Sequence, residues 1–275
     1  MSALLARLLD DAALFPPDRV PPDGVRPDRV RGERVGLDEA LPTYRRVARH
    51  PAAGRFLCPA SRFAELRTRL VPEDLLDLGL VADTGIQDLS ATLEAAQGEP
   101  RVRVTALRIP LPGDADQARA AAVTIARLPS GAPAHIEVRP SPGWRDALDR
   151  VAAARERGAP LGAAYRTSCA VERLAAFISA CAERELPFVL EGGQEGGREG
   201  PSPVHALLAA ATAAAGAGEG DVRDALSRAD PGDVITDLLT LGEEEAVGAR
   251  RLLSAYGTPG IETALGALRP ISITG

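Results

Sequence analysis

The sequence contains no lysine: all 32 of its basic residues are arginine, and asparagine is absent as well. GC-rich coding explains both absences without any chemical cause. The consequence for function is the same whatever the cause. Without lysine there is no Schiff-base aldolase, no lysine-anchored pyridoxal phosphate and no phosphate-loop lysine. Arginine keeps its proton, so it binds anions well and serves poorly as a general base.

Cysteine and long apolar runs are also scarce. The three cysteines, Cys58, Cys169 and Cys181, form neither a disulfide framework nor a cluster with metal-ligand spacing, which fits a reducing compartment. No apolar run approaches the ~20 residues that a membrane helix requires. Asp10 and Asp11 interrupt the apolar N-terminal segment, which argues against a signal peptide. The chain is therefore expected to be cytoplasmic, with no membrane partner.

Aromatic residues make up only 3% of the chain, whereas hydrophobic residues make up 45%. The core must rest on Leu, Val, Ile and Ala, which suits strands that helices bury on both faces. A net charge of −6 argues against nucleic acid as a partner, because neutralising phosphates needs a basic surface. The length of 275 residues is normal for a single α/β barrel, so 1–275 is predicted to be one domain, either monomeric or oligomeric.

Short apolar runs alternate with helical patterns along the chain. This alternation predicts parallel βαβ units. Helical spacing appears near 61–70, 87–97, 114–128, 143–157 and 171–184. The candidate strands are 55–60, 78–83, 102–110, 134–138, 161–166, 187–192 and 251–257.

The remaining segments complete the predicted architecture. Residues 2–14 form a leucine-rich helical pattern, and 15–36 form a loop in which five prolines forbid a helix. A Gly-rich loop covers 191–203, and extra helices follow it. Residues 271–274 are either a closing strand or a tail. The expected fold is a TIM-barrel-like (β/α) barrel with seven or eight parallel strands, since the nucleotide fingerprint of a doubly wound sheet is absent.

Three carboxylates end alternate candidate strands: Asp83, Glu137 and Glu191. Active sites of such barrels lie at the C-terminal ends of the strands, so these side chains are candidates for acid and base catalysis. They are also candidates for a Mg²⁺ or Mn²⁺ site, although no cofactor is required by the sequence. The other interpretation is that they cap the following helices or lie in solvent. Asp83 in particular begins Asp-Thr-Gly, a sequence that favours a turn.

Arg166 is the most informative single residue. It ends an apolar strand, where a charge is costly unless paired, and guanidinium is a natural clamp for a carboxylate or phosphate. An ion pair with Glu137 or Glu191 inside the barrel is an equally good interpretation. Thr167 and Tyr165 flank Arg166 and are candidate substrate contacts, Tyr165 being an equally good core residue.

Several stretches together resemble a family of uncharacterised actinobacterial proteins. They are LLDDAALFPP (8–17), FLCPASRFAEL (56–66), GLVADTG (79–85), Arg166 with Thr167, and AAFISACAERELPF (175–188). The resemblance spans most of the chain and implies a barrel, but the family has no assigned reaction. It implies that Asp11, Asp83, Glu137, Arg166 and Thr167 are the site positions to carry over.

The departures from this pattern fall on two strands. The family pattern has Lys-Leu-Arg-Thr-Gly-Gly where this chain has Ala164–Cys169, and Phe-Lys followed by Gly-Leu-His-His where it has Phe188–Glu195. Both lysines and the histidine pair are replaced. If they carry the family's chemistry, this member has changed its reaction or lost it.

Two functions follow as hypotheses. The first is an enzyme of specialised metabolism that acts on a small anionic metabolite by proton transfer, as a lyase, isomerase or cyclase. Arg166 would bind the anion, and Glu137 with Asp83 or Glu191 would act as acid and base. The second is a non-catalytic barrel that binds a small ligand or a protein partner after losing its ancestral catalytic groups.

Overall fold

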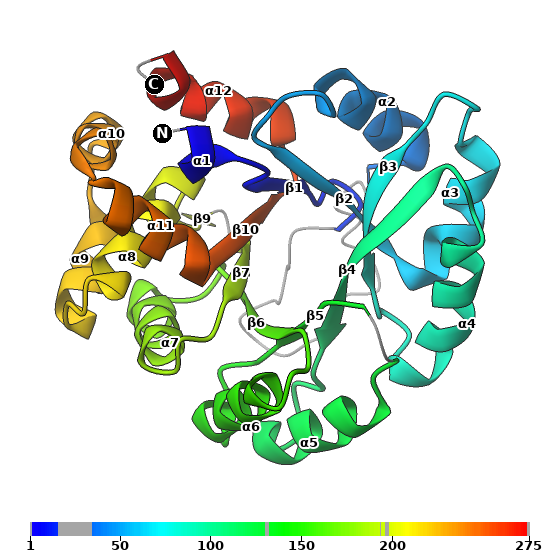
Figure 1. The fold of residues 1–275 in the computed structure, drawn as a ribbon, viewed down its shortest axis with the longest axis horizontal. Helices are drawn as coiled ribbons and strands as arrows, with labels where there is room; N and C mark the ends of the chain where they lie inside the picture. Colours follow the sequence, from blue (N-terminus) through cyan, green and yellow to red (C-terminus); the bar gives the residue numbers. More distant parts are fainter. Residues whose placement is uncertain (1, 16–34, 130–131, 193, 196–197, 274–275) are drawn as a thin grey trace.

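A computed structural model describes residues 2–15, 35–129, 132–192, 194–195 and 198–273. Within these residues eight parallel strands close a barrel in the order β1-β10-β7-β6-β5-β4-β3-β2, with helices around it (Figure 1). The expected TIM-barrel-like α/β fold is therefore confirmed. The strands are β1 (Leu9–Asp11), β2 (Ala53–Pro59), β3 (Leu76–Val81), β4 (Val102–Pro110), β5 (Ala134–Glu137), β6 (Leu161–Arg166), β7 (Phe188–Glu191) and β10 (Leu253–Thr258).

The barrel closes through the N-terminal strand β1, whose Leu9–Asp11 pair with Tyr256–Thr258 of β10. The prediction of one helix over 2–14 is wrong, because α1 covers only Ser2–Leu5 and a strand follows it. A run of leucines is compatible with a helix or a strand, and residues 9–11 form a strand because they pair with β10 and β2. The suggested closing strand at 271–274 is also wrong, since Ile271–Ile273 belong to helix α12 (Ile261–Ile273).

The helices follow the strands as predicted for βα units. They are α2 (Leu37–Val47), η1 (Ala60–Arg62), α3 (Phe63–Arg69), α4 (Ile86–Gln97), α5 (Gln117–Arg127), α6 (Trp144–Glu156) and α7 (Val171–Glu183). Leu174, Phe177, Ile178 and Cys181 recur at helical spacing in α7, and all four are buried against the barrel.

Extra helices follow β7, as expected. They are α8 (Pro203–Ala214), α9 (Glu219–Ser227), α10 (Pro231–Thr240) and α11 (Glu243–Leu252), and they lie together on one side of the barrel (Figure 1). The predicted Gly-rich loop includes the end of β7 and two short antiparallel strands, β8 (Gln194–Glu195) and β9 (Arg198–Glu199). Residues 16–34 of the predicted Pro-rich loop lie outside the described residues. In the part of the chain that the structure describes, every helix is too short or too polar to cross a membrane.

Candidate functional site

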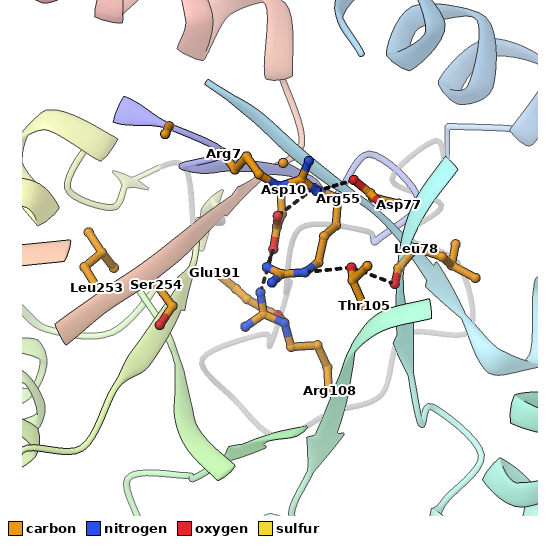
Figure 2. A network of polar contacts seen from close by, with 12 residues as sticks. Arg7, Asp10, Arg55, Asp77, Leu78, Thr105, Arg108, Glu191, Leu253 and Ser254 are labelled. Atoms are coloured by element: carbon orange, nitrogen blue, oxygen red, sulfur yellow. Dashed lines mark hydrogen bonds and ion pairs between the residues drawn. The ribbon is translucent and has the colours of Figure 1, made fainter. Parts of the chain in front are cut away.

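An ion pair crosses the interior of the barrel. Nη2 of Arg108, on β4, lies 2.9 Å from Oδ2 of Asp10, on β1, and both side chains are fully buried (Figure 2). β2 and β3 separate these strands in the sheet, so the two side chains can meet only through the interior. Because successive side chains point to opposite faces of a strand, the inward direction of Asp10 and Arg108 shows which residues of β1 and β4 face the interior.

Arg55 extends this network toward the N-terminal ends of the strands. Its backbone N–H donates to Asp10 at 2.8 Å, and its Nε donates to Thr105 Oγ1 at 3.1 Å. Thr105 and Arg108 are three residues apart, a spacing that normally puts two side chains on opposite faces of a strand, yet both face inward. The β3–β4 register shifts between Leu78 and Gly79, and this irregularity lets β4 present both side chains to the interior.

Glu191 ends β7 next to this network. Its Oε1 lies 4.0 Å from Nε of Arg108, and its side chain is 14% exposed. Burial and the nearby Glu137 carboxylate raise the pKa of Glu191, while Arg108 and Arg166 oppose the increase. Glu191 is thus a carboxyl group of raised pKa at the end of a barrel strand, where the active sites of this fold lie.

Glu137 and Arg166 form a direct pair where β5 and β6 end. Nε of Arg166 donates to Oε1 of Glu137 at 2.9 Å, and Nη2 of Arg139 lies 3.3 Å from the same oxygen. The internal ion pair, one of the two interpretations of Arg166, is therefore present. Arg166 also lies level with Glu191 on the adjacent strand, so these acidic and basic groups form one cluster.

A pocket of about 290 Å³ opens beside this cluster. Arg139, Arg166 and Arg173 line it together with Glu137, and Ser168 lies at its edge. Among the described residues the lining holds three guanidinium groups and one carboxylate, and planar guanidinium suits the two oxygens of a carboxylate ligand. We call this the rim pocket.

The interior of the barrel is unusual in its side chains. Ala164, Val189 and Ala255 pack on one another there, and Gly257 lies level with both Asp10 and Glu191. Barrels of this type usually fill the interior with bulky branched residues. Here two alanines, Gly257 and charged groups take part of that place beside Val189.

His135 lies inside the same barrel, on β5. A Cβ atom at Gly162 would lie 2.8 Å from its ring, so glycine on β6 makes room for it. Burial and then the charges of Arg108 and Arg55 hold the pKa of His135 well below its usual range. The imidazole is therefore neutral at pH 7, and its Nδ1 has no hydrogen-bond partner among the described residues.

Asp83 lies apart from the cluster. Asp83 is exposed two residues beyond β3, where it accepts hydrogen bonds from the backbone N–H and the hydroxyl of Ser61. Asp83 therefore bonds back to η1 and does not cap the following helix α4, whose N-cap is Gly85. Asp83 borders a different pocket, of about 470 Å³, next to Leu14 and Phe15.

Thr167 and Tyr165 are buried. The Thr167 hydroxyl donates to the carbonyl oxygen of Glu191 at 3.2 Å, so it joins β6 to β7. The Tyr165 ring stacks on Phe177 at 4.5 Å between β6 and α7, while part of its side chain borders the rim pocket. Burial raises its pKa above the ordinary value.

Asp11 is buried at the end of β1. Its Oδ1 accepts from the backbone N–H of Ala13 at 2.9 Å, and its Oδ2 has no partner among the described residues. Burial raises the pKa of Asp11 to about 7. Because Asp10 points into the barrel, Asp11 points away from it.

Within the described residues, no three His, Cys, Asp or Glu side chains are grouped so as to hold a metal ion. Asp83, Glu137 and Glu191 accordingly do not form a common carboxylate site. Asp10, Arg108 and His135 were not selected as site residues from the sequence. A charge within the apolar run VRVTALRIP is the same signal that drew attention to Arg166, and it also applies to Arg108.

Comparison of the chain with protein-family models, with curated proteins and with solved structures finds no match.

Proposed function

We propose that this protein is an enzyme that acts on a small anionic metabolite by proton transfer. The observation that carries the proposal is Glu191, a largely buried carboxyl group of raised pKa at the end of a barrel strand, within 4.0 Å of Arg108. A general acid or base works best when its pKa lies near the working pH. Burial and Glu137 shift Glu191 in that direction.

Each group of the cluster has a separate role in this proposal. Glu191 transfers the proton. Arg166 and Arg139 bind the anionic group of the substrate in the rim pocket, and Glu137 orients Arg166 through their 2.9 Å contact. Arg139 and Arg166 hold the Glu137 carboxylate, which in this proposal positions Arg166 and raises the pKa of Glu191.

The reaction classes that fit are those in which a C–H proton next to a carbonyl or carboxylate leaves: a lyase, an isomerase or a cyclase. The absence of lysine excludes a Schiff-base route. The departures from the actinobacterial pattern on β6 and β7 support a specialised pathway rather than a central one. A cytoplasmic location and kinship with that family belong to the same proposal.

Hydrogen–deuterium exchange into candidate substrates tests the proposal. Purified protein in D₂O is incubated with 2-hydroxy, 2-oxo and 3-oxo carboxylates, and loss of C–H signals is followed by proton NMR. We expect exchange with at least one class, and a loss of roughly a hundredfold or more in Glu191→Gln. Glu94→Gln, on the exposed face of α4, is the matched control and retains the wild-type rate. No exchange with any class argues against the enzyme.

A second function, a non-catalytic barrel that binds a small anion, is favoured by one observation. The Arg166–Glu137 and Arg108–Asp10 pairs tie charged side chains to one another, which leaves fewer of them for proton transfer. Retained anion binding together with absent exchange in the same panel would support this function over the first.

A further inference from the structure

A third pocket, of about 680 Å³, lies between helices α1, α10 and α11, which share one side of the barrel (Figure 1). Most of its wall is apolar and is formed by Ala3, Leu4, Leu239, Leu241, Ala246 and Val247. Arg250, which borders it, bonds to Leu253 and Ser254 at the start of β10, whereas the rim pocket opens where β5 and β6 end. This pocket, which we call the α11 pocket, is therefore at the opposite end of the strands from the candidate site.

One stripe of α11 faces the α11 pocket. It consists of Glu243, Ala246, Val247 and Arg250, whose spacings of three and four residues put them on one face of the helix. Ala249 and Leu252, on the other face of α11, are buried, whereas the apolar Val247 is 60% exposed. The stripe is thus an apolar wall with a carboxylate at one end and a guanidinium at the other. A concave, mostly apolar surface with a few polar groups is typical of a small-molecule site.

Arg250 is a partly buried cation at one end of the stripe. Its Nη atoms donate to three backbone carbonyl oxygens, and these partners carry no net charge. Burial lowers the pKa of Arg250 to about 10, so the guanidinium is still charged at pH 7. A partly desolvated cation without a counter-ion favours an added negative charge nearby. Arg251 is exposed and borders the same pocket, so its donors are available to that anion.

We propose that the α11 pocket binds a monocarboxylate with an unbranched apolar chain. The carboxylate accepts hydrogen bonds from Arg251 and lies near the charge of Arg250, and the chain runs over Val247 toward Glu243. Seven positions separate Glu243 from Arg250, roughly 10 Å along the helix, which an extended chain of about eight carbon atoms spans. This inference goes beyond the proposed function and does not depend on it.

Glu243 makes the α11 pocket selective for a single carboxylate. A second carboxylate at the far end of the chain would meet the like charge of Glu243. A neutral alcohol of the same length would fill the apolar wall but would leave Arg250 without a counter-ion. Octanoate, suberate and octan-1-ol have chains of the same length and differ only in these end groups.

Calorimetric titration of the intact protein with each of these three compounds, below the concentration at which it aggregates, tests the proposal. We expect octanoate to bind, and suberate and octan-1-ol to bind about tenfold or more weakly. Arg251→Gln should weaken octanoate about fivefold or more. The matched control is Arg127→Gln, an exposed arginine in the last turn of α5, which should leave the affinity unchanged. Equal affinity for the three compounds, or equal weakening in the two variants, overturns the proposal.

Val247→Glu is a second variant that does not disturb the buried face of α11. It puts a carboxylate on the apolar wall and should abolish octanoate binding, whereas Val123→Glu, on the exposed part of α5, should not. Unchanged binding in Val247→Glu refutes the α11 pocket. A dimer in analytical ultracentrifugation that Val247→Glu dissociates also overturns the proposal, because the apolar wall is then an interface between two copies of the chain.

A crystal structure of the protein soaked in octanoate locates the ligand. Density for the chain along α11 supports the proposal, and density in the rim pocket alone overturns it. The proposed enzyme is tested separately, since Arg251→Gln and Val247→Glu lie away from the rim pocket and should keep the wild-type rate of deuterium exchange. Octanoate bound along α11 without any deuterium exchange refutes only the enzyme, whereas exchange without octanoate binding refutes only the α11 pocket.

Discussion

Asp10 and Arg108 form a fully buried ion pair of 2.9 Å that joins β1 to β4 across the barrel interior. The Asp10 carboxylate also accepts the backbone N–H of Arg55 from the adjacent strand. One carboxylate therefore fixes the short strand that closes the barrel and holds two arginines in place (Figure 2).

Asp10→Ala is expected to destabilise the protein strongly. The substitution leaves Arg108 buried without its counter-ion, which costs about 3–5 kcal/mol in comparable buried pairs. Urea unfolding measures the loss. Asp77→Ala is the control, because Asp77 pairs with the more exposed Arg7 and Arg103 and its loss should cost less than about 1 kcal/mol. Similar losses in the two variants would contradict the importance of the interior pair.

Asp11 is expected to make the fold less stable as the pH rises. Its pKa increases from 3.8 to about 7 on folding, so its contribution is greatest below pH 3.8 and is lost as the pH rises through 7. A shift of this size corresponds to about 4 kcal/mol. Asp11→Asn keeps the acceptor for Ala13 and removes the charge, so it should exceed wild type in stability at pH 8 but not at pH 4. Parallel stability curves for the two proteins from pH 4 to pH 8 would refute the buried, protonated Asp11.

Arg250 is expected to stabilise the N-terminal end of the barrel. Its guanidinium donates to the carbonyl oxygens of Ala6, Leu253 and Ser254, and these bonds tie α11 to β10 and to the segment before β1. Arg250→Ala should lose about 2–4 kcal/mol, since hydrogen bonds from charged groups contribute about 1.5–3 kcal/mol each and water replaces part of them.

Hydrogen exchange by mass spectrometry localises that effect. Amides of β10 should exchange faster in Arg250→Ala than in wild type, whereas the exposed neighbour Arg251→Ala should change neither stability nor exchange. Faster exchange spread evenly over all strands would show that Arg250 has no specific role at β1 and β10.

Gly162→Ala is expected to distort the interior. The added methyl would lie 2.6 Å from the carbonyl oxygen of Pro187 and 2.8 Å from the ring of His135, both closer than van der Waals contact. The cost should be about 1–3 kcal/mol, measured by thermal unfolding. Gly220→Ala, on helix α9 with nothing within 4 Å, should instead gain about 0.5–1 kcal/mol. An unchanged stability of Gly162→Ala in thermal unfolding would show that β6 and His135 move apart easily.

The other seven strands of the barrel, β2 to β7 and β10, were predictable because each combines a short apolar run with a helical pattern beside it. The first strand was not, because Leu9–Asp11 is too short to show a period of two and lies in a leucine-rich segment that also suits a helix. Its partners Tyr256–Thr258 lie more than 200 positions away in the chain. Local propensity carries no information about such a pairing.

The candidate site, like the fold, was only partly predictable from the sequence. Glu137, Glu191 and Arg166 were identifiable as charges at the ends of apolar strands, and the structure places them in one cluster. Asp83 shows the same sequence signal, but β3 ends two residues earlier and its carboxylate bonds to Ser61. The sequence places Asp10 as one of two charges in a predicted N-terminal helix. In the structure it faces inward because its strand closes the barrel.

By itself, the sequence determined the chemistry that is excluded and the class of fold. The absence of lysine follows from composition, and the βα alternation follows from local hydrophobic period. Only the tertiary structure decided which charges meet. Closing the barrel brings Asp10, Arg108 and Glu191 together from strands distant in sequence, and burial there raises the pKa of Glu191.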